Sequence, residues 1–230
     1  MKTLIFLPCF NDNDTVNGLV KEILAKYQAH CIVIDDGSQV PIIIDQENDN
    51  VILHRFERNQ GIGICSALAL NYAKHEDYDA FIRIDSDGEH NVSDIERLMN
   101  EASVSKSNVV SGQRTNFNKK SGLLDFLKNI GKAFINLSSR KLTKIEIHDW
   151  WSGMMYFDKK AIYSLSSIRP GTYPEAEYYL SAISKDLTIS TIDIEQNIRE
   201  GESTMSLKRG IIVVLRFCIV ALSYLIKRRS

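Results

Sequence analysis

The sequence predicts an α/β domain built on a mostly parallel, Rossmann-like sheet with helices on both faces. Two observations support this: short, almost continuously apolar runs alternate with amphipathic periods, and three of the runs end in polar, mostly acidic turns. Continuously apolar strands are typical of parallel sheets that are covered on both faces. With 230 residues, 44% hydrophobic and 25% charged, the chain suits one such domain and excludes a disordered, fibrous or polytopic membrane protein.

Strand and helix signals follow one another in order along the first half of the chain. Amphipathic spacing predicts helices at 16–27 and 64–74. A third helix is expected from 93 to about 102, because Ser93 and Glu96 have capping-box spacing. Short apolar runs bounded by turn-forming residues predict strands at 3–7, 31–34, 51–55, 79–84 and 108–111.

The second half is less regular. We expect a basic amphipathic helix at 123–142, a strand at 152–157, a helix at 175–184 and a strand at 188–194. Charge also divides the chain. Residues 1–110 carry 9 basic and 18 acidic side chains, whereas 111–230 carry 19 basic and 11 acidic ones. An acidic first half could bind a cation, and a basic second half could face anionic lipid or a phosphorylated acceptor. The alternative is that the two halves are only two solvated faces of one domain.

The cellular compartment is indicated by the opening segment and the cysteines. The run MKTLIFLPCF is short and is followed by no small-residue cleavage site, so it is interpreted as the first strand and not as an export signal. The cysteines show no CxxC or Cys/His spacing, which argues against a zinc site or a disulfide scaffold and favours a reducing compartment. They are Cys9, Cys31, Cys65 and Cys218.

The last segment, 206–230, contains a 16-residue apolar run at 211–226 that is interrupted by Arg216 and has basic residues on both sides. About 20 apolar residues are needed to span a bilayer, so the run is short. A narrow polar stripe formed by Arg209, Arg216, Ser223 and Lys227 favours a helix lying in the membrane interface. Packing on the sheet, packing on a second subunit and a tilted span stay open as alternatives.

Polar residues cluster where three predicted strands end, at 11–12, 35–38 and 85–87. In doubly wound sheets, ligands bind at the carboxyl ends of the strands, so these clusters predict one site. Asp85 and Asp87 are suited to hold Mg²⁺ or Mn²⁺ against a diphosphate, unless they form only a solvated turn. Asp36 suits a base N–H or a ribose hydroxyl, although Asp-Gly-Ser is also an ordinary β-turn. Residues 59–63 open a helix whose amides favour phosphate.

The order of these clusters resembles the family-2 glycosyltransferases with the GT-A fold, and most closely the subgroup that transfers sugars to polyprenyl phosphates such as dolichyl or undecaprenyl phosphate. The resemblance covers roughly 3–205 and implies a GT-A domain at 1–205. Within it, 1–115 would be the nucleotide-sugar and metal half and 116–205 the acceptor half. The matching segments are 7–12, 33–38, 59–63, 84–90, 110–114, 149–153 and 199–203.

The resemblance also implies roles for individual residues. The metal would be held by Asp85, Asp87 and Glu89, and we expect Asp87→Asn to abolish turnover. Arg199 and Ser203 would lie on the acceptor side. The nucleotide would contact Pro8, Phe10, Asp12, Ile34, Asp36, Asp85, Ser86 and Arg114.

Several positions depart from the family pattern. Phe10 and Asp12 stand where Tyr and Glu are usual, and Ile62 replaces a frequent Lys. Met154-Met155 replaces a Phe-Arg pair typical of polyprenyl-phosphate members, and Thr204 replaces a Lys. The loss of cations weakens the lipid-phosphate assignment, whereas the donor half matches well.

The acceptor determines whether the reaction needs a base. A sugar hydroxyl requires a general base, for which Asp149, Glu175 and Glu177 are the candidates. A phosphate monoester, with a second pKa of about 6, is already largely dianionic at neutral pH. Either Trp150 or Trp151 could pack beneath the sugar, and core packing explains at least one of them equally well.

Together these patterns predict a cytoplasmic enzyme, peripheral on the inner face of the cell membrane. It would move a sugar from a UDP- or GDP-sugar to a lipid phosphate or a glycan hydroxyl, with inversion implied by the resemblance. Two rivals stay open: a nucleotidyltransferase, although 8–12 lacks its Gly-rich basic loop, and a non-catalytic nucleotide-sugar-binding subunit. Nucleic acid is not expected as a partner, and homo-oligomerisation is left open.

Overall fold

The computed structural model describes residues 1–44, 49–115, 147–171 and 174–197. Several predicted features lie outside these ranges: the helix at 123–142, Arg199, Ser203 and the segment 206–230. Within the described ranges, no helix combines the length and the apolarity needed to cross a membrane.

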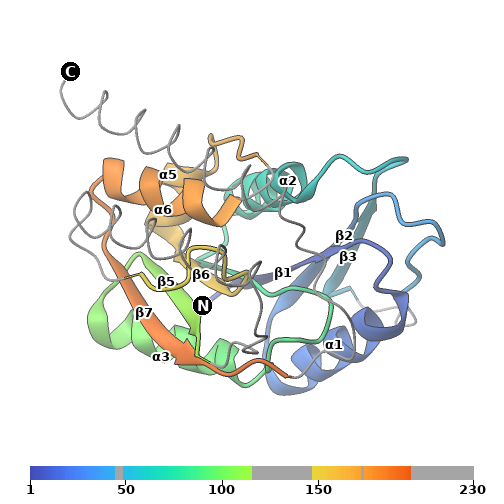
Figure 1. The fold of residues 1–230 in the computed structure, drawn as a ribbon, viewed down its shortest axis with the longest axis horizontal. Helices are drawn as coiled ribbons and strands as arrows, with labels where there is room; N and C mark the ends of the chain where they lie inside the picture. The colour runs from blue at the N-terminus through green and yellow to red at the C-terminus, as the bar shows by residue number, and fades with distance from the viewer. Residues whose placement is uncertain (45–48, 116–146, 172–173, 198–230) are drawn as a thin grey trace, which may run out of the picture.

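Seven strands form one mixed sheet in the order β3-β2-β1-β4-β6-β5-β7 (Figure 1). All neighbouring pairs are parallel except those made by β6, which lies antiparallel between β4 and β5. The mostly parallel sheet that the sequence predicts is thereby confirmed. The strands are β1 (Thr3–Cys9), β2 (His30–Asp35), β3 (Val51–Arg55), β4 (Ala80–Arg83), β5 (Val109–Arg114), β6 (Met155–Asp158) and β7 (Ile189–Ile194).

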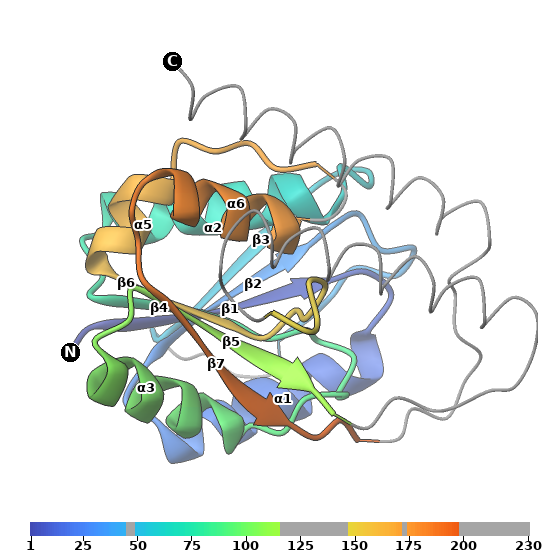
Figure 2. The same cartoon turned by 60° about the vertical axis from the view of Figure 1, so that its left-hand side comes forward.

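Helices cover both faces of the sheet, as predicted. In Figures 1 and 2, α2, α5 and α6 lie over one face, and α1 and α3 lie over the other. Each face has its own hydrophobic cluster, because successive residues of a strand point to opposite sides. The helices are α1 (Asn13–Lys26), α2 (Ile62–His75), α3 (Asp94–Ser105), α5 (Lys159–Leu165) and α6 (Pro174–Ser184).

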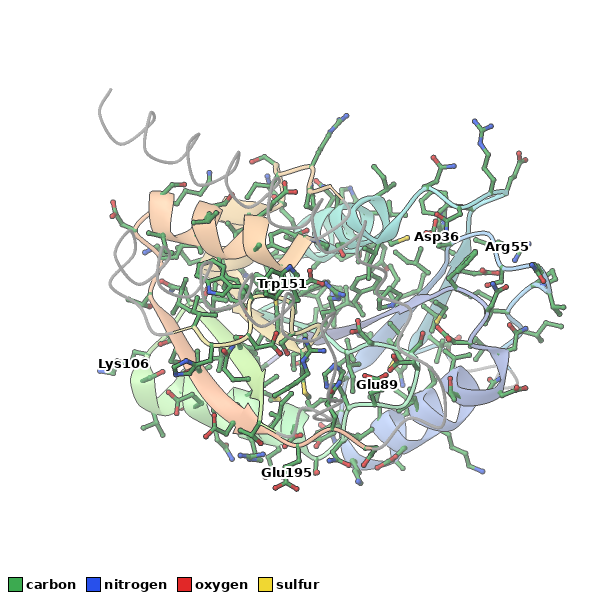
Figure 3. All side chains as sticks on the ribbon, viewed as in Figure 1. Asp36, Arg55, Glu89, Lys106, Trp151 and Glu195 are labelled. Atoms are coloured by element: carbon green, nitrogen blue, oxygen red, sulfur yellow. The ribbon has the colours of Figure 1, made fainter. Side chains whose placement is uncertain are left out.

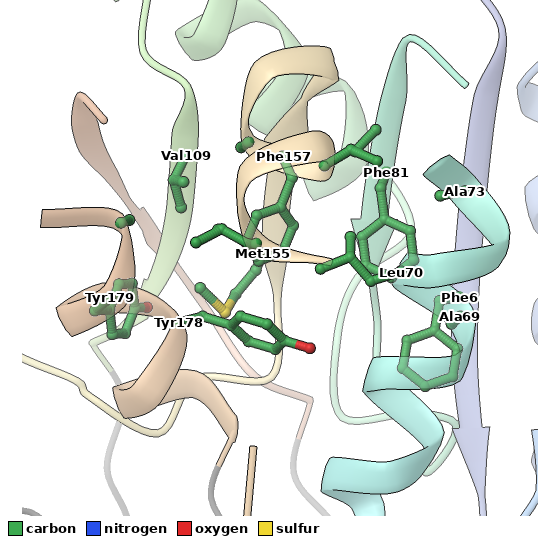
Figure 4. Packing of buried hydrophobic residues seen from close by; sticks show 14 of the residues in the cluster. Phe6, Ala69, Leu70, Ala73, Phe81, Val109, Met155, Phe157, Tyr178 and Tyr179 are labelled. Carbon is green, nitrogen blue, oxygen red and sulfur yellow. The ribbon is translucent and has the colours of Figure 1, made fainter. Parts of the chain in front are cut away.

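Alternation along β1 illustrates how the two clusters form. Leu4 and Phe6 belong to the cluster beneath α2, α5 and α6, whereas Ile5 and Leu7 belong to the cluster beneath α1 and α3. Figure 4 shows the first cluster, in which Tyr178 of α6 packs against β6, with its ring centroid 5.5 Å from that of Phe157. Burying each such side chain contributes about 1.5–3 kcal/mol to the free energy of folding. The two clusters therefore hold the strands together and keep the polar turns at their carboxyl ends in place.

The structure corrects three local predictions. The helix α5 was not predicted; Asp158 caps it by accepting a hydrogen bond from the Ala161 amide at 2.7 Å. The strand expected from residue 152 begins only at Met155. The third predicted helix is present and begins at Asp94, directly after Ser93. The capping box is absent, however, because Ser93 has helical backbone angles and its side chain makes no capping bond.

Candidate active site

The polar clusters that follow β1, β2 and β4 are joined by hydrogen bonds. The Asn11 amide donates to the Ser38 hydroxyl at 2.9 Å. The Ser86 hydroxyl lies 2.7 Å from both the Pro8 carbonyl and an Asp12 carboxylate oxygen. Residues from three separate connections therefore meet at one edge of the sheet, as the sequence predicts.

Asp35 stabilises the turn after β2. It is fully buried, accepts from the amides of Ser38 (2.8 Å) and Ile42 (3.1 Å), and forms an ion pair with Arg55. Burial alone would raise the pKa of Asp35, but these donors outweigh burial and lower it. Asp35 therefore holds the turn in place. The neighbouring carboxylate, Asp36, is the one directed toward the helix α2.

Asp36 joins the turn after β2 to the start of α2. Its two oxygens accept from the amides of Gln60 at 2.7 Å and Gly61 at 2.9 Å. The side chain is only 5% exposed, and Figure 3 shows it where β2 meets the loop before α2. A carboxylate has about four acceptor sites. Asp36 thus retains capacity for a base or ribose donor, and this role stays a prediction.

Three neighbours fix the orientation of Asp85. Arg83 Nη2 lies 3.0 Å from Oδ1, and His90 Nε2 lies 3.8 Å from Oδ2. Gly153 packs against the same carboxylate so closely that an added Cβ would lie 1.9 Å from Oδ2. Burial opposes ionisation, but Arg83 and His90 outweigh it and hold the pKa of Asp85 below its usual range.

Asp87 has the opposite electrostatic environment. Burial, and then the charges of Asp85 and Glu89, raise its pKa to about 6, although its Oδ1 accepts from the Glu89 amide at 3.0 Å. A cation at this position would relieve that repulsion, so the two aspartates fit a divalent ion. In the described part of the chain, no three His, Cys, Asp or Glu side chains form a complete metal cage. Mg²⁺ and Mn²⁺ commonly use one or two carboxylates and complete their shell with phosphate oxygens and water.

The loop at 88–90 is tied to the chain that follows β7. Glu89 accepts from the Gln196 side chain at 2.7 Å, and its carbonyl accepts from the Asn197 amide at 2.8 Å. His90 and Gln196 form an isolated β-bridge. The segment leading toward the predicted acceptor residues, which begin at 199, is thus held against the predicted metal loop. Glu89, labelled in Figure 3, has a clear structural role there, and metal binding by it stays a prediction.

Arg114 and Asp149 form a two-pronged ion pair. Arg114 contacts both carboxylate oxygens, with Nη2 2.9 Å from Oδ1, and the Trp151 amide also donates to Asp149 at 3.2 Å. Buried Gln113 orients this turn, because its Oε1 accepts from the amides of His148 (2.8 Å) and Asp149 (2.7 Å). Asp149 therefore holds Arg114 in a fixed orientation, and its contact with a phosphate stays a prediction.

The two glutamates of α6 point to different surroundings, as their spacing predicts. Glu175 is 5% exposed and forms an ion pair with Arg83, whereas Glu177 accepts from the Gly171 amide at 2.9 Å. Burial raises the pKa of Glu175 although Arg83 opposes this.

The two adjacent tryptophans also differ in burial. Trp150 is fully buried in the core, and Trp151 is only partly buried, beside α6 in Figure 3.

The other residues predicted to contact the nucleotide differ in how exposed they are. Phe10 is 47% exposed at the end of β1, and Pro8 and Asp12 are partly buried. Ile34 is fully buried in the hydrophobic cluster beneath α2. Their contacts with a nucleotide stay predictions.

Sequence reasoning missed Arg83, His90 and Gly153, which surround Asp85. One signal was present for Arg83: it is the only charged residue in the run Ala80–Ile84 and shares the strand face of Phe81. Gly153 gave no such signal, because it meets Asp85 across 68 positions of the chain, and His90, although only five residues after Asp85, belongs to no local pattern that marks it as a partner of that carboxylate.

A mixed sheet with helices on both faces and acidic turns at the carboxyl ends of its strands is typical of nucleotide-dependent transferases of the GT-A type. Residues 4–166 match the family model described as glycosyl transferase family 2. The chain belongs to this family, and it is a glycosyltransferase, as the sequence predicts.

Relatives and solved structures agree with this assignment. A UDP-N-acetylglucosamine–dolichyl-phosphate N-acetylglucosaminyltransferase of Methanococcus voltae is 23% identical over 87% of this chain and 90% of its own. Glucosyl-3-phosphoglycerate synthase from Mycobacterium tuberculosis, in complex with Mn²⁺, UDP-glucose and phosphoglyceric acid, has a TM-score of 0.71 and 15% identity, over 97% of this chain and 79% of that one. S. aureus TarS in complex with UDP-GlcNAc has a TM-score of 0.61 and 16% identity, over 95% of this chain and 67% of that one. These likenesses confirm the fold.

Proposed function

We propose that the protein transfers a sugar from a UDP- or GDP-sugar to a polyprenyl phosphate, and that Asp85 and Asp87 would hold the Mg²⁺ or Mn²⁺ that the reaction uses. The family supplies the reaction class. The named dolichyl-phosphate transferase and the structural relative that contains Mn²⁺ and UDP-glucose support the finer assignment.

The observation that carries the choice of acceptor is that all three candidate bases already accept hydrogen bonds, and that two of them, Asp149 and Glu175, are each paired with an arginine. Asp149 is bound by Arg114, Glu175 by Arg83, and Glu177 by the Gly171 amide. A sugar hydroxyl needs an available base to accept its proton. A phosphate acceptor needs none, because it is already largely dianionic at neutral pH. The arrangement therefore favours a phosphate nucleophile.

The chain's own residues would orient the donor and the acceptor. Asp36 and Phe10 would contact the base and the ribose, and Asp85 and Asp87 would hold the diphosphate and its cation. A bound divalent cation would neutralise charge that develops on the diphosphate as it leaves. Arg114, held by Asp149, would direct its guanidinium at a phosphate of the donor or the acceptor. An acceptor oxygen would bond to the anomeric carbon as the bond to the diphosphate breaks, in one inverting displacement.

Lipid acceptors lie in a membrane, and the proposal places the enzyme at its inner face. The basic apolar segment 206–230 would bind this surface as an interfacial helix, with its Lys and Arg residues attracted to anionic lipid. Vesicle co-sedimentation with and without anionic lipid tests this part of the proposal.

The function is tested with the full chain, Mn²⁺ and a panel of UDP- and GDP-sugars. Donor consumption is expected to rise with undecaprenyl phosphate and not with undecaprenol, which has the same chain but no phosphate. EDTA should abolish the reaction. Stimulation by a glycan and not by undecaprenyl phosphate would contradict the acceptor assignment, and nucleotide binding without turnover on either acceptor would indicate a non-catalytic subunit.

A further inference from the structure

Arg83 places a charge inside the sheet. It belongs to β4, between β1 and β6, and is 3% exposed. Its side chain shares a strand face with Phe81, on the side covered by α2 and α6. A buried charge is unfavourable unless it is paired and hydrogen-bonded, so this position requires specific partners.

The guanidinium group of Arg83 joins two carboxylates from distant parts of the chain. Nη1 pairs with Glu175 at the start of α6, and Nη2 lies 3.0 Å from Oδ1 of Asp85. Arginine is suited to this bridge, because its planar fork stays charged and can direct separate N–H groups at two acceptors. Glu175 thus balances the charge of Arg83 and leaves Asp85 available for another ligand.

The two oxygens of Asp85 are consequently distinct. Oδ1 accepts from Arg83, whereas Oδ2 faces Gly153 and lies 3.8 Å from Nε2 of His90. Asp85 remains partly exposed although Arg83 and Glu175 are almost completely buried. The bridge therefore lies beneath the site, with the accessible carboxylate above it.

We propose that Arg83 is a positioning residue for the metal site: it fixes the carboxylate of Asp85 for cation binding, and Glu175 serves as its buried counter-charge and not as the catalytic base. This inference rests on the proposed metal-dependent function. It predicts that substitutions in the Arg83–Glu175 pair lower the affinity for the cation even where they leave folding unchanged.

The test compares Mn²⁺ binding with stability. Free Mn²⁺ is measured by electron paramagnetic resonance in the presence of UDP or GDP, and unfolding of the metal-free protein is followed by circular dichroism. The double variant Arg83→Met/Glu175→Met replaces the buried pair with apolar side chains, which frequently preserves folding. Its Mn²⁺ affinity is expected to fall about 10–100-fold, the usual effect of removing a residue that orients a metal ligand.

Arg83→Lys provides a second test if the double variant does not fold. Lysine retains the charge but lacks the fork, so a fall of similar size is expected. Arg97→Met is the matched control: it breaks the ion pair with buried Asp94 in α3 and should leave Mn²⁺ affinity unchanged. Glu175→Gln keeps an acceptor for Arg83 but removes the counter-charge, so Mn²⁺ affinity should fall while turnover at saturating Mn²⁺ and donor stays within about 10-fold of wild type. Loss of a general base would typically cost about 10²–10⁴-fold even at saturation.

The outcomes separate the two proposals. Wild-type Mn²⁺ affinity in a folded Arg83 variant, or loss of turnover with intact Mn²⁺ binding in Glu175→Gln, overturns the positioning role. Failure of the wild-type chain to bind Mn²⁺ with either nucleotide overturns the proposed function itself.

Discussion

Asp87→Asn is expected to stabilise the metal-free protein at pH 8 while abolishing turnover. Burial and the charges of Asp85 and Glu89 raise the pKa of Asp87 from 3.8 to about 6, so ionisation of this side chain opposes folding. At about 1.4 kcal/mol per pH unit, that rise corresponds to about 3 kcal/mol. Asparagine stays neutral, and its side-chain oxygen can still accept from the Glu89 amide.

The pH dependence follows from the sign of the change. Since the pKa is higher in the folded state, the protonated carboxyl favours folding, and this contribution is complete below pH 3.8 and lost as the pH rises through about 6. The advantage of asparagine should therefore be absent near pH 3.5 and full near pH 8. For a domain of this size, about 3 kcal/mol corresponds to a rise in Tm of about 6–12 °C.

Thermal unfolding in EDTA at both pH values measures this difference. Asp14→Asn is the control, because Asp14 is an exposed aspartate in the first turn of α1 and should change stability by less than about 1 kcal/mol at either pH. Adding Mn²⁺ and the donor nucleotide should stabilise the wild type but not Asp87→Asn, so that the wild type then melts at the higher temperature. An Asp87→Asn variant that melts below the wild type at pH 8, or by the same margin at both pH values, would refute the reasoning.

Three further results are expected around the same turn. Gly153→Ala should weaken Mn²⁺-dependent nucleotide binding at least about 10-fold by calorimetry, because its Cβ would displace Asp85, and an unchanged affinity would contradict that contact. Ser86→Ala should lower the free energy of unfolding by about 1–3 kcal/mol in urea, because it removes the hydroxyl that bonds Asp12; no loss would mean that the bond contributes nothing. Mn²⁺ affinity should decrease as the pH falls through about 6, since Asp87 must lose its proton to bind the ion, and a flat calorimetric profile would argue against Asp87 as a ligand.

The parts of the fold that depend on local pattern could be predicted from the sequence. The early strands were found because each is an apolar run that ends in a polar turn, and Asp36, Asp85 and Asp87 could be placed at one edge because parallel strands end together. The insertion of β6 between β4 and β5 could not be predicted, since it depends on pairing between residues far apart in the chain.

The candidate site shows the same limit. The carboxylates were evident, but their partners were not, because Arg83 meets Glu175 across 92 residues of chain. The helix α5 was missed for a different reason: it has only 7 residues, too few to establish a helical period, although Asp158 is a good capping residue.

The attachment of residues 88–90 to 195–197 has a consequence for how the site forms. Glu89 and Gln196 are separated by 107 positions, so their contact closes a long loop of chain and has an entropic cost that the rest of the fold must offset. A chain ending at residue 115 would include almost every predicted donor contact but would lack both β6 and this tether. The predicted donor and acceptor halves therefore share one sheet, and the loop that carries the predicted metal ligands is held in place by the chain that follows β7.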